Sequence, residues 1–117
     1  MSVTATRSIT IVYSGDVVGT ETITAASNTS SPGSVEIKEL ASGANTITPP
    51  TGGTTAKAVT ILPPSGNVVT ITLKGLTGDT GFLLSPTEST TLALAAGTTT
   101  FVLTCSATLT GIRFYWT

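Results

Sequence analysis

Apolar and polar residues alternate along most of this chain with the period of two that is typical of strands. The segment SITIVY places Ile9, Ile11 and Tyr13 on one face, and NVVTITL at 67–73 repeats the same rhythm. A helical period fits only ESTTLALAA at 88–96, where the threonines favour a strand or a turn instead. The pattern therefore predicts a protein built from strands.

Turn-forming residues separate these strands at intervals of about ten residues. The clearest breaks are ASNTSSPGS at 26–34 and the Pro-Pro and Gly-Gly pairs within 49–53. The segment PPSGN at 63–67 has the length and composition of a β-hairpin connection. Short strands with regular turns predict an all-β fold, namely an antiparallel β-sandwich of the jelly-roll kind.

The breaks also suggest how the chain is organised. We expect the β-sandwich domain at 41–117, because the strands follow one another most regularly there. Residues 1–40 are expected to form N-terminal strands that either add to an edge of the sandwich or extend as an arm that pairs with a neighbour. The break at 26–34 favours some independence for this segment.

The alternation also assigns residues to the interior. In VEIKEL at 35–40, we expect Val35 and Ile37 to face inward and Glu36 and Lys38 to face outward. The other residues expected to supply the buried faces are Val59, Ile61, Val69, Ile71, Leu73, Leu103 and Phe114.

Charge excludes several classes of partner. Only 9% of the residues are charged and the net charge is −1, so the chain has no basic face for nucleic acid or for an anionic membrane. No stretch approaches the roughly 18 apolar residues of a membrane span, and the first residues do not resemble a secretory signal. We therefore expect synthesis in a cytoplasm, with no nucleic-acid or membrane partner.

The sequence offers little for catalysis. It contains no histidine, which removes the usual general base, Ser-His and Cys-His nucleophile pairs and most zinc sites. The single cysteine, Cys105, lies in the apolar run TFVLTCSA and is expected in the core. We predict no enzyme, no catalytic residue, no metal and no cofactor.

The segment KGLTGDTG at 74–81 is the strongest candidate for chemistry. It lacks the lysine that follows the last glycine of a phosphate loop, and it has too few oxygen side chains for a calcium loop. We expect a structural corner in which Gly75, Gly78 and Gly81 supply positive φ and Asp79 bonds its own turn amides. A hydrolase that uses Asp79 and Glu88 is the remote alternative.

The C-terminal aromatic residues divide between two faces of a strand. Phe114 and Trp116 share one face and are expected to close the core, while Arg113 and Tyr115 share the other. Since Tyr and Arg are favoured in interfaces, we predict Arg113 and Tyr115 as partner contacts. The alternative is a carbohydrate-binding β-sandwich module in which Tyr115 or Trp116 stacks on a sugar.

Few charges are available to protect the edges of these sheets. Isolated β-proteins place lysines and other charges on edge strands, whereas NVVTITL at 67–73 and TTTFVLTC at 98–105 are neutral. If these strands are open edges, they should recruit another chain. We therefore expect a homo-oligomer, with a trimer as the first guess, or a subunit bound to a host surface.

A resemblance to a known class supports this expectation. The segments NTITPP, AVTILPPSGNVVTITLKGLTGDTGFLLSPTE, TLALAAGTTTFVLT and GIRFYW resemble the small β-sandwich proteins of tailed-bacteriophage virions. These segments cover roughly the last 70 residues, and LKGLTGDTG with the terminal aromatic strand resembles that class most.

The resemblance implies a non-enzymatic structural protein of the virion, such as a head-decoration, cement or fibre-base protein. Such proteins are often oligomeric and bind a capsid or tail shell. It therefore implies the protein itself and a major capsid protein or another virion protein as partners. It does not identify the position in the virion.

Overall fold

The computed structural model describes residues 35–50, 56–95 and 100–117 in full, and the backbone of four strands before residue 30. All elements in these parts of the chain are strands, which confirms the all-β prediction. The N-terminal strands are β1 (Thr4–Ala5), β2 (Ser8–Tyr13), β3 (Gly19–Thr24) and β4 (Asn28–Thr29). They are followed by β5 (Val35–Leu40), β6 (Gly43–Ile47), β7 (Ala58–Leu62), β8 (Ile71–Lys74), β9 (Phe82–Leu83), β10 (Thr90–Ala93), β11 (Phe101–Cys105) and β12 (Leu109–Trp116).

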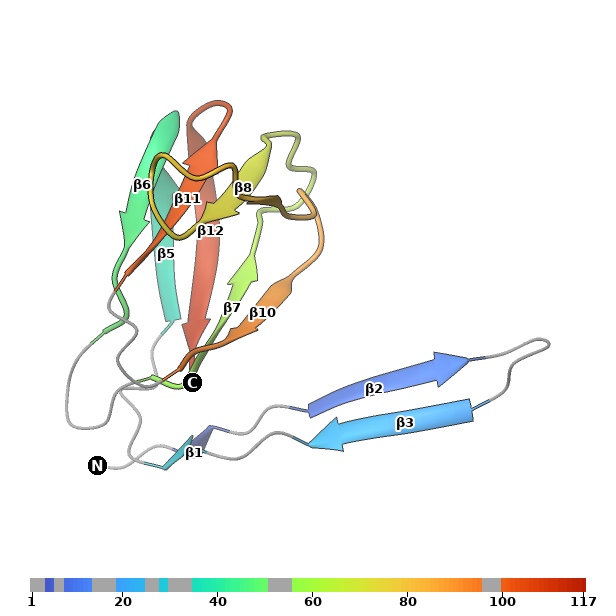
Figure 1. Cartoon of the computed structure of the whole chain (residues 1–117). Helices are drawn as coiled ribbons and strands as arrows, with labels where there is room; N and C mark the ends of the chain where they lie inside the picture. Colours follow the sequence, from blue (N-terminus) through green and yellow to red (C-terminus); the bar gives the residue numbers. More distant parts are fainter. Residues whose placement is uncertain are drawn as a thin grey trace.

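Two antiparallel sheets of four strands form the body of the protein (Figure 1). One sheet has the order β10-β7-β12-β5 and the other has the order β6-β11-β8-β9. This arrangement is that of the predicted antiparallel β-sandwich. Strand β5 lies within residues 1–40, so this part of the N-terminal segment adds an edge strand to the first sheet. Strands β2 and β3 pair with each other and β1 pairs with β4, outside both large sheets.

The strand pairs are nested along the chain. β5 pairs with β12, β6 with β11, β7 with β10 and β8 with β9, all antiparallel. Every connection from β5 to β12 except the β8–β9 corner crosses from one sheet to the other. Apolar residues on the inner faces of both sheets therefore meet in one core.

Two aromatic residues of β12, Phe114 and Trp116, belong to this core. Phe114 and Trp116 are buried and stacked, with ring centroids 6.2 Å apart, and Phe101 lies 6.5 Å from Trp116. This confirms the prediction that Phe114 and Trp116 close the core. Of the other residues predicted to be inside, four are buried and two, Val69 and Leu73, are partly buried against the same cluster; the four are Val59, Ile61, Ile71 and Leu103.

A bulge in β12 keeps its apolar residues facing inward. The register with β5 shifts between Thr110 and Ile112, and the inserted residue, Gly111, has a φ of 86°. A positive φ is accessible to glycine without a steric penalty, which is the geometry of a glycine bulge. The extra residue allows Leu109 and Ile112 to be buried although they are three positions apart.

The prediction for the faces of β5 is wrong. Val35 and Ile37 are 57% and 66% exposed, while Glu36 and Lys38 lie on the inner side. The Lys38 Nζ lies 3.1 Å from the Glu36 carboxylate and 5.8 Å from the centroid of the Phe114 ring. The reason is that Leu40 shares a face with these two charged residues, and Leu40 is the residue of β5 that enters the core.

The two neutral strands expected to be open edges are interior strands. β11 pairs with β6 on one side and with β8 on the other. β8 pairs with β11 and, at Thr72 and Leu73, with β9. The edges of the two sheets are instead β5, β10, β6 and β9. The premise that these segments are open edges is therefore wrong for β8 and β11. The unpaired edges are those of the four other strands, among which β5 is the longest.

Asn45 fastens the β5–β6 connection. Its Oδ1 accepts a hydrogen bond of 3.0 Å from the Ala41 N–H, and its Nδ2 donates bonds of 2.9–3.2 Å to three backbone carbonyls. These carbonyls belong to Ala41, Gly43 and Leu103. One side chain therefore joins the turn after β5 to β6 and β11.

Replacing Asn45 with alanine is expected to lower the free energy of unfolding by about 1–3 kcal/mol, because several backbone groups lose their partners. Urea denaturation followed by circular dichroism measures this loss. The matched control is Thr46→Ala at the next position, where the side chain is exposed and the cost should stay within about 0.5 kcal/mol. Equal losses in the two variants would show that the Asn45 hydrogen bonds do not stabilise this connection.

Candidate interaction surface

The outer face of the β10-β7-β12-β5 sheet carries the predicted contact residues. Along β12, Arg113 is exposed and Tyr115 is half-buried, whereas Phe114 between them is fully buried. The alternation therefore places Arg113 and Tyr115 on the outer face, as expected from the sequence. Their role as partner contacts remains a prediction.

The register brings the two exposed aliphatic residues of β5 beside them. Ile37 pairs with Arg113 and Val35 pairs with Tyr115. Residues directly opposite each other in neighbouring strands point to the same face. The structure thus assembles Val35, Ile37, Arg113 and Tyr115 into one surface, which we call the β5–β12 patch.

On the same outer face, the surface continues from β12 to β7. On its other side, Arg113 pairs with Leu62 of β7 and Tyr115 pairs with Thr60. The Thr60 hydroxyl is 2.9 Å from that of Thr91 on β10, so the outer face becomes polar toward this opposite edge. The apolar side chains are therefore concentrated at the β5 edge.

A groove adjoins the patch next to Arg113. It has a volume of about 490 Å³ and is lined by Leu62, Pro63, Pro64, Ser65, Thr87, Gly111 and Arg113. The prolines come from the connection between β7 and β8. The prediction that this connection is a β-hairpin is wrong, because β7 and β8 lie in different sheets. The groove combines an apolar wall with one guanidinium group, a combination suited to a polypeptide partner.

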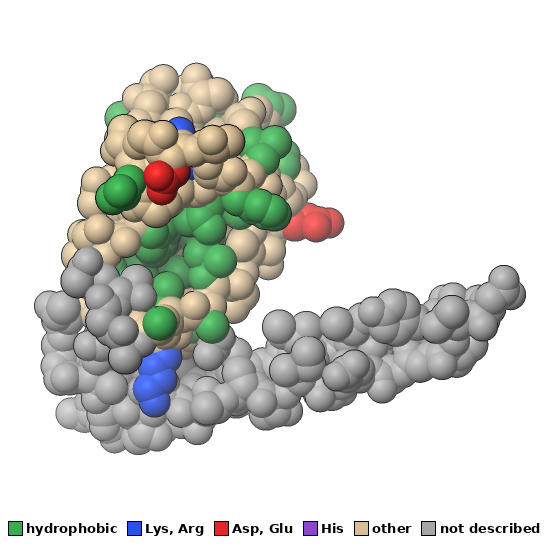
Figure 2. Space-filling view, viewed as in Figure 1, with side chains coloured by type: hydrophobic (Ala, Val, Ile, Leu, Met, Phe, Trp, Pro, Cys, Tyr) green, Lys and Arg blue, Asp and Glu red, His purple; other side chains and the backbone are tan. Residues whose placement is uncertain are grey.

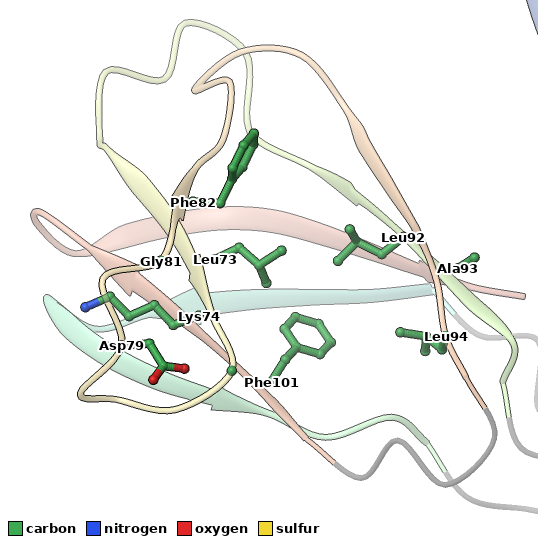
Figure 3. Close-up of a pocket in the computed structure, with 10 residues that line it drawn as sticks. Leu73, Lys74, Asp79, Gly81, Phe82, Leu92, Ala93, Leu94 and Phe101 are labelled. Atoms are coloured by element: carbon green, nitrogen blue, oxygen red, sulfur yellow. The ribbon is translucent and has the colours of Figure 1, made fainter.

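A second groove lies between β8–β9 and β10 (Figure 3). Leu73, Leu92 and Phe101 point toward one another across it, while the Lys74 amine points away. Figure 2 shows hydrophobic side chains gathered in a hollow on the visible face of the protein. At its rim, Phe82 is 70% exposed. The alternating pattern gave no signal for this groove, because it depends on how far the two sheets separate.

The glycine-rich segment forms a corner, as predicted. The Asp79 carboxylate accepts a hydrogen bond of 2.8 Å from the Leu76 N–H, and the Asp79 N–H donates to the Leu76 carbonyl. Asp79 therefore closes its own turn. The prediction of positive φ is correct for Gly81, at 82°, and wrong for Gly75 and Gly78.

The two remaining candidates for chemistry are Glu88 and Cys105. The backbone N–H of Glu88 bonds the Ser85 hydroxyl at 3.0 Å within an exposed loop. Cys105 is buried in the core, as expected, and burial raises the pKa of its thiol. Within the described ranges, no group of three or more metal-ligating side chains comes together.

Trp116 cannot serve as a sugar platform. It is only 2% exposed and lies against Phe114 and Phe101. This part of the carbohydrate-binding alternative is wrong, because stacking on a sugar requires an accessible ring face. Tyr115 is the aromatic residue of β12 that reaches the outer face.

Known proteins do not extend this description. No protein-family model, curated protein or solved structure matches the chain. In the part of the chain that the structure describes, there is no helix with the length and apolarity to cross a membrane. Function must therefore be argued from the surface itself.

Proposed function

We propose that this chain is a non-enzymatic structural protein of a tailed-phage virion, which binds a capsid or tail shell as a homo-oligomer and decorates or stabilises it. The observation that carries the proposal is the β5–β12 patch. In this patch Val35 and Ile37, which are exposed on the edge strand β5, lie beside Arg113 and Tyr115 of β12. An edge strand offers unpaired backbone groups, and aliphatic, Tyr and Arg side chains beside it favour a protein partner.

The nested strand pairs add support from the fold. Eight strands in which the first pairs with the last, and so on inward to β8 and β9, are consistent with the jelly roll expected from the sequence. Jelly rolls recur in viral capsid proteins and in lectins. The fold alone does not decide between them, so the surface must.

The resemblance of the last 70 or so residues to small virion proteins favours the capsid over the lectin. The burial of Trp116 points the same way, because it leaves Tyr115 as the stacking residue for a sugar. A glycan array tests that alternative directly. Binding that disappears in Tyr115→Ala would favour the carbohydrate-binding module.

Binding to phage shells tests the proposal. The purified chain is mixed with capsids and tails of the source phage that lack it, and the bound fraction is measured by sedimentation. We expect saturable binding, and at least about a tenfold loss of affinity in the Arg113→Ala/Tyr115→Ala double variant, a change of about 1.4 kcal/mol or more.

The matched control is Thr91→Ala, on the same outer face but at the β10 edge, which should bind as the parent does. A chain that binds neither shell would contradict the proposed function. Binding that the double variant leaves unchanged would contradict the role of Arg113 and Tyr115.

A further inference from the structure

Strand β5 has one side without a strand partner among the described residues, since it ends the order β10-β7-β12-β5. Its six residues make it the longest of the four edge strands. β6 has five residues, β10 has four and β9 has two. β5 is therefore the edge with the most backbone to offer a partner.

We propose that β5 pairs antiparallel with β5 of a second copy, about a two-fold axis that passes beside Ile37, so that the two sheets join into one. The inference deepens the proposed function by naming the partner of the β5 edge, and it rests on that function only for the use of this surface in assembly. A two-fold contact must be self-complementary, so the residues of β5 must suit one another.

The charges of β5 select the register. In a two-fold antiparallel pair, one residue faces its own copy and its neighbours face each other in reverse order. With Ile37 at the centre, Glu36 faces Lys38 of the second copy, and Lys38 faces Glu36 of the second copy. Opposite charges directly across a sheet are favourable, and here they occur twice.

Neighbouring registers are unfavourable. Centring the pair on Glu36 or on Lys38 places like charges opposite each other, and centring it on Glu39 does the same. A register centred between two residues would place the inner face of one sheet opposite the outer face of the other. The sequence VEIKEL thus favours the Ile37-centred pair.

The contacts on the outer face of the sheet are also favourable in this register. Ile37, which is 66% exposed, meets Ile37 of the second copy, and Val35 is covered from the side. Glu36 and Lys38 already form an ion pair within one strand, on the inner face of β5. The Lys38 Nζ is 3.1 Å from a Glu36 carboxylate oxygen. In the dimer each of these two residues gains a second partner across the axis, while Glu39 faces Val35 of the second copy.

The same two charges could act in the opposite way. Charged residues that point inward on an edge strand are one of the devices that prevent edge-to-edge association. If they act so here, the chain stays monomeric at β5. The two readings predict opposite results, so variants of these residues decide between them.

The experiment measures the molar mass of the full chain by light scattering and sedimentation across a range of concentrations. We expect a monomer–dimer equilibrium that reaches twice the 11.7 kDa of one chain. Lys38→Glu places carboxylates opposite one another and should weaken the dimer at least about tenfold. The variant Glu36→Lys should do the same with ammonium groups.

Two rescues separate this register from a general loss of folding. The double variant Glu36→Lys/Lys38→Glu restores opposite charges and should dimerise as the parent does. Mixing the two single variants should give heterodimers, because one edge is then acidic and the other basic. The matched control is Lys57→Glu, at an exposed lysine outside β5 that directly precedes β7, which should leave the mass unchanged. Circular dichroism confirms that each variant is folded.

A chain that stays monomeric at high concentration, or that forms a trimer, would overturn the two-fold contact. Failure of both rescues would overturn the register. These failures are distinct from failure of the proposed function: a monomer that still binds phage shells leaves the virion role intact. Conversely, a dimer that binds no shell leaves the two-fold contact intact and removes the virion role.

Discussion

Replacing Phe114 with alanine is expected to lower the free energy of unfolding by about 3–5 kcal/mol. The ring is fully buried, stacks on Trp116 and lies under the Lys38 ammonium group. Its removal leaves a cavity between the two sheets that neighbours on a regular strand cannot fill. Since small domains are stable by about 5–15 kcal/mol, the variant should lose a large part of its total stability.

Phe82→Ala provides the matched control for this prediction, because it removes the same side chain from a position that is 70% exposed. We expect a change within about 0.5 kcal/mol. Urea denaturation followed by far-ultraviolet circular dichroism measures both variants without depending on Trp116, whose fluorescence the Phe114 change would alter. Similar losses in the two variants would be incompatible with the core described above.

Replacing Gly81 with alanine should be nearly as damaging. Its φ of 82° is costly for any residue with a Cβ, by about 1–2 kcal/mol. The added Cβ would also lie 2.6 Å from Lys74 Cγ, 2.7 Å from Thr72 Cγ2 and 2.8 Å from the Leu73 carbonyl oxygen. The last of these is backbone of β8, so the corner must move. We expect a total loss of about 2–5 kcal/mol.

Two other glycines separate the causes of this loss. Gly66 has a φ of 71° and open space around its Cβ position, so Gly66→Ala should show the backbone cost alone. Gly78 has open space and no positive φ, so Gly78→Ala should be close to neutral. The same denaturation measurement should rank the losses as Gly78, then Gly66, then Gly81. A variant at Gly81 no less stable than that at Gly66 would show that the close contacts relax freely.

The fold class could be read from the sequence because it depends on local alternation. The faces of β12 were correct for the same reason: Phe114 and Trp116 on one side, Arg113 and Tyr115 on the other. Segment 35–40 failed because both of its faces contain apolar residues. Val35 and Ile37 compete there with Leu40, and only the pairing with β12 decides which face is buried.

The order of the strands within each sheet could not be predicted from the sequence. Whether β8 and β11 are edges depends on partners far away along the chain, such as the pairing of Phe101 with Ile47. The neutral character of these strands suits interior positions, so the correct signal was present and was interpreted as a lack of protection. Of the β5–β12 patch, the sequence predicted Arg113 and Tyr115. Its aliphatic half was missed along with the faces of β5.

The nested pairing of the strands also constrains the order of events during folding. Each large sheet has an interior strand that comes late in the chain: β11 joins β6 to β8, and β12 joins β5 to β7. Until β12 is in place, β5 has no neighbour in its sheet and β7 is paired with β10 alone. Sheet closure of such high contact order is slow. A ribosome must therefore synthesise the chain through Trp116 before the sandwich can form.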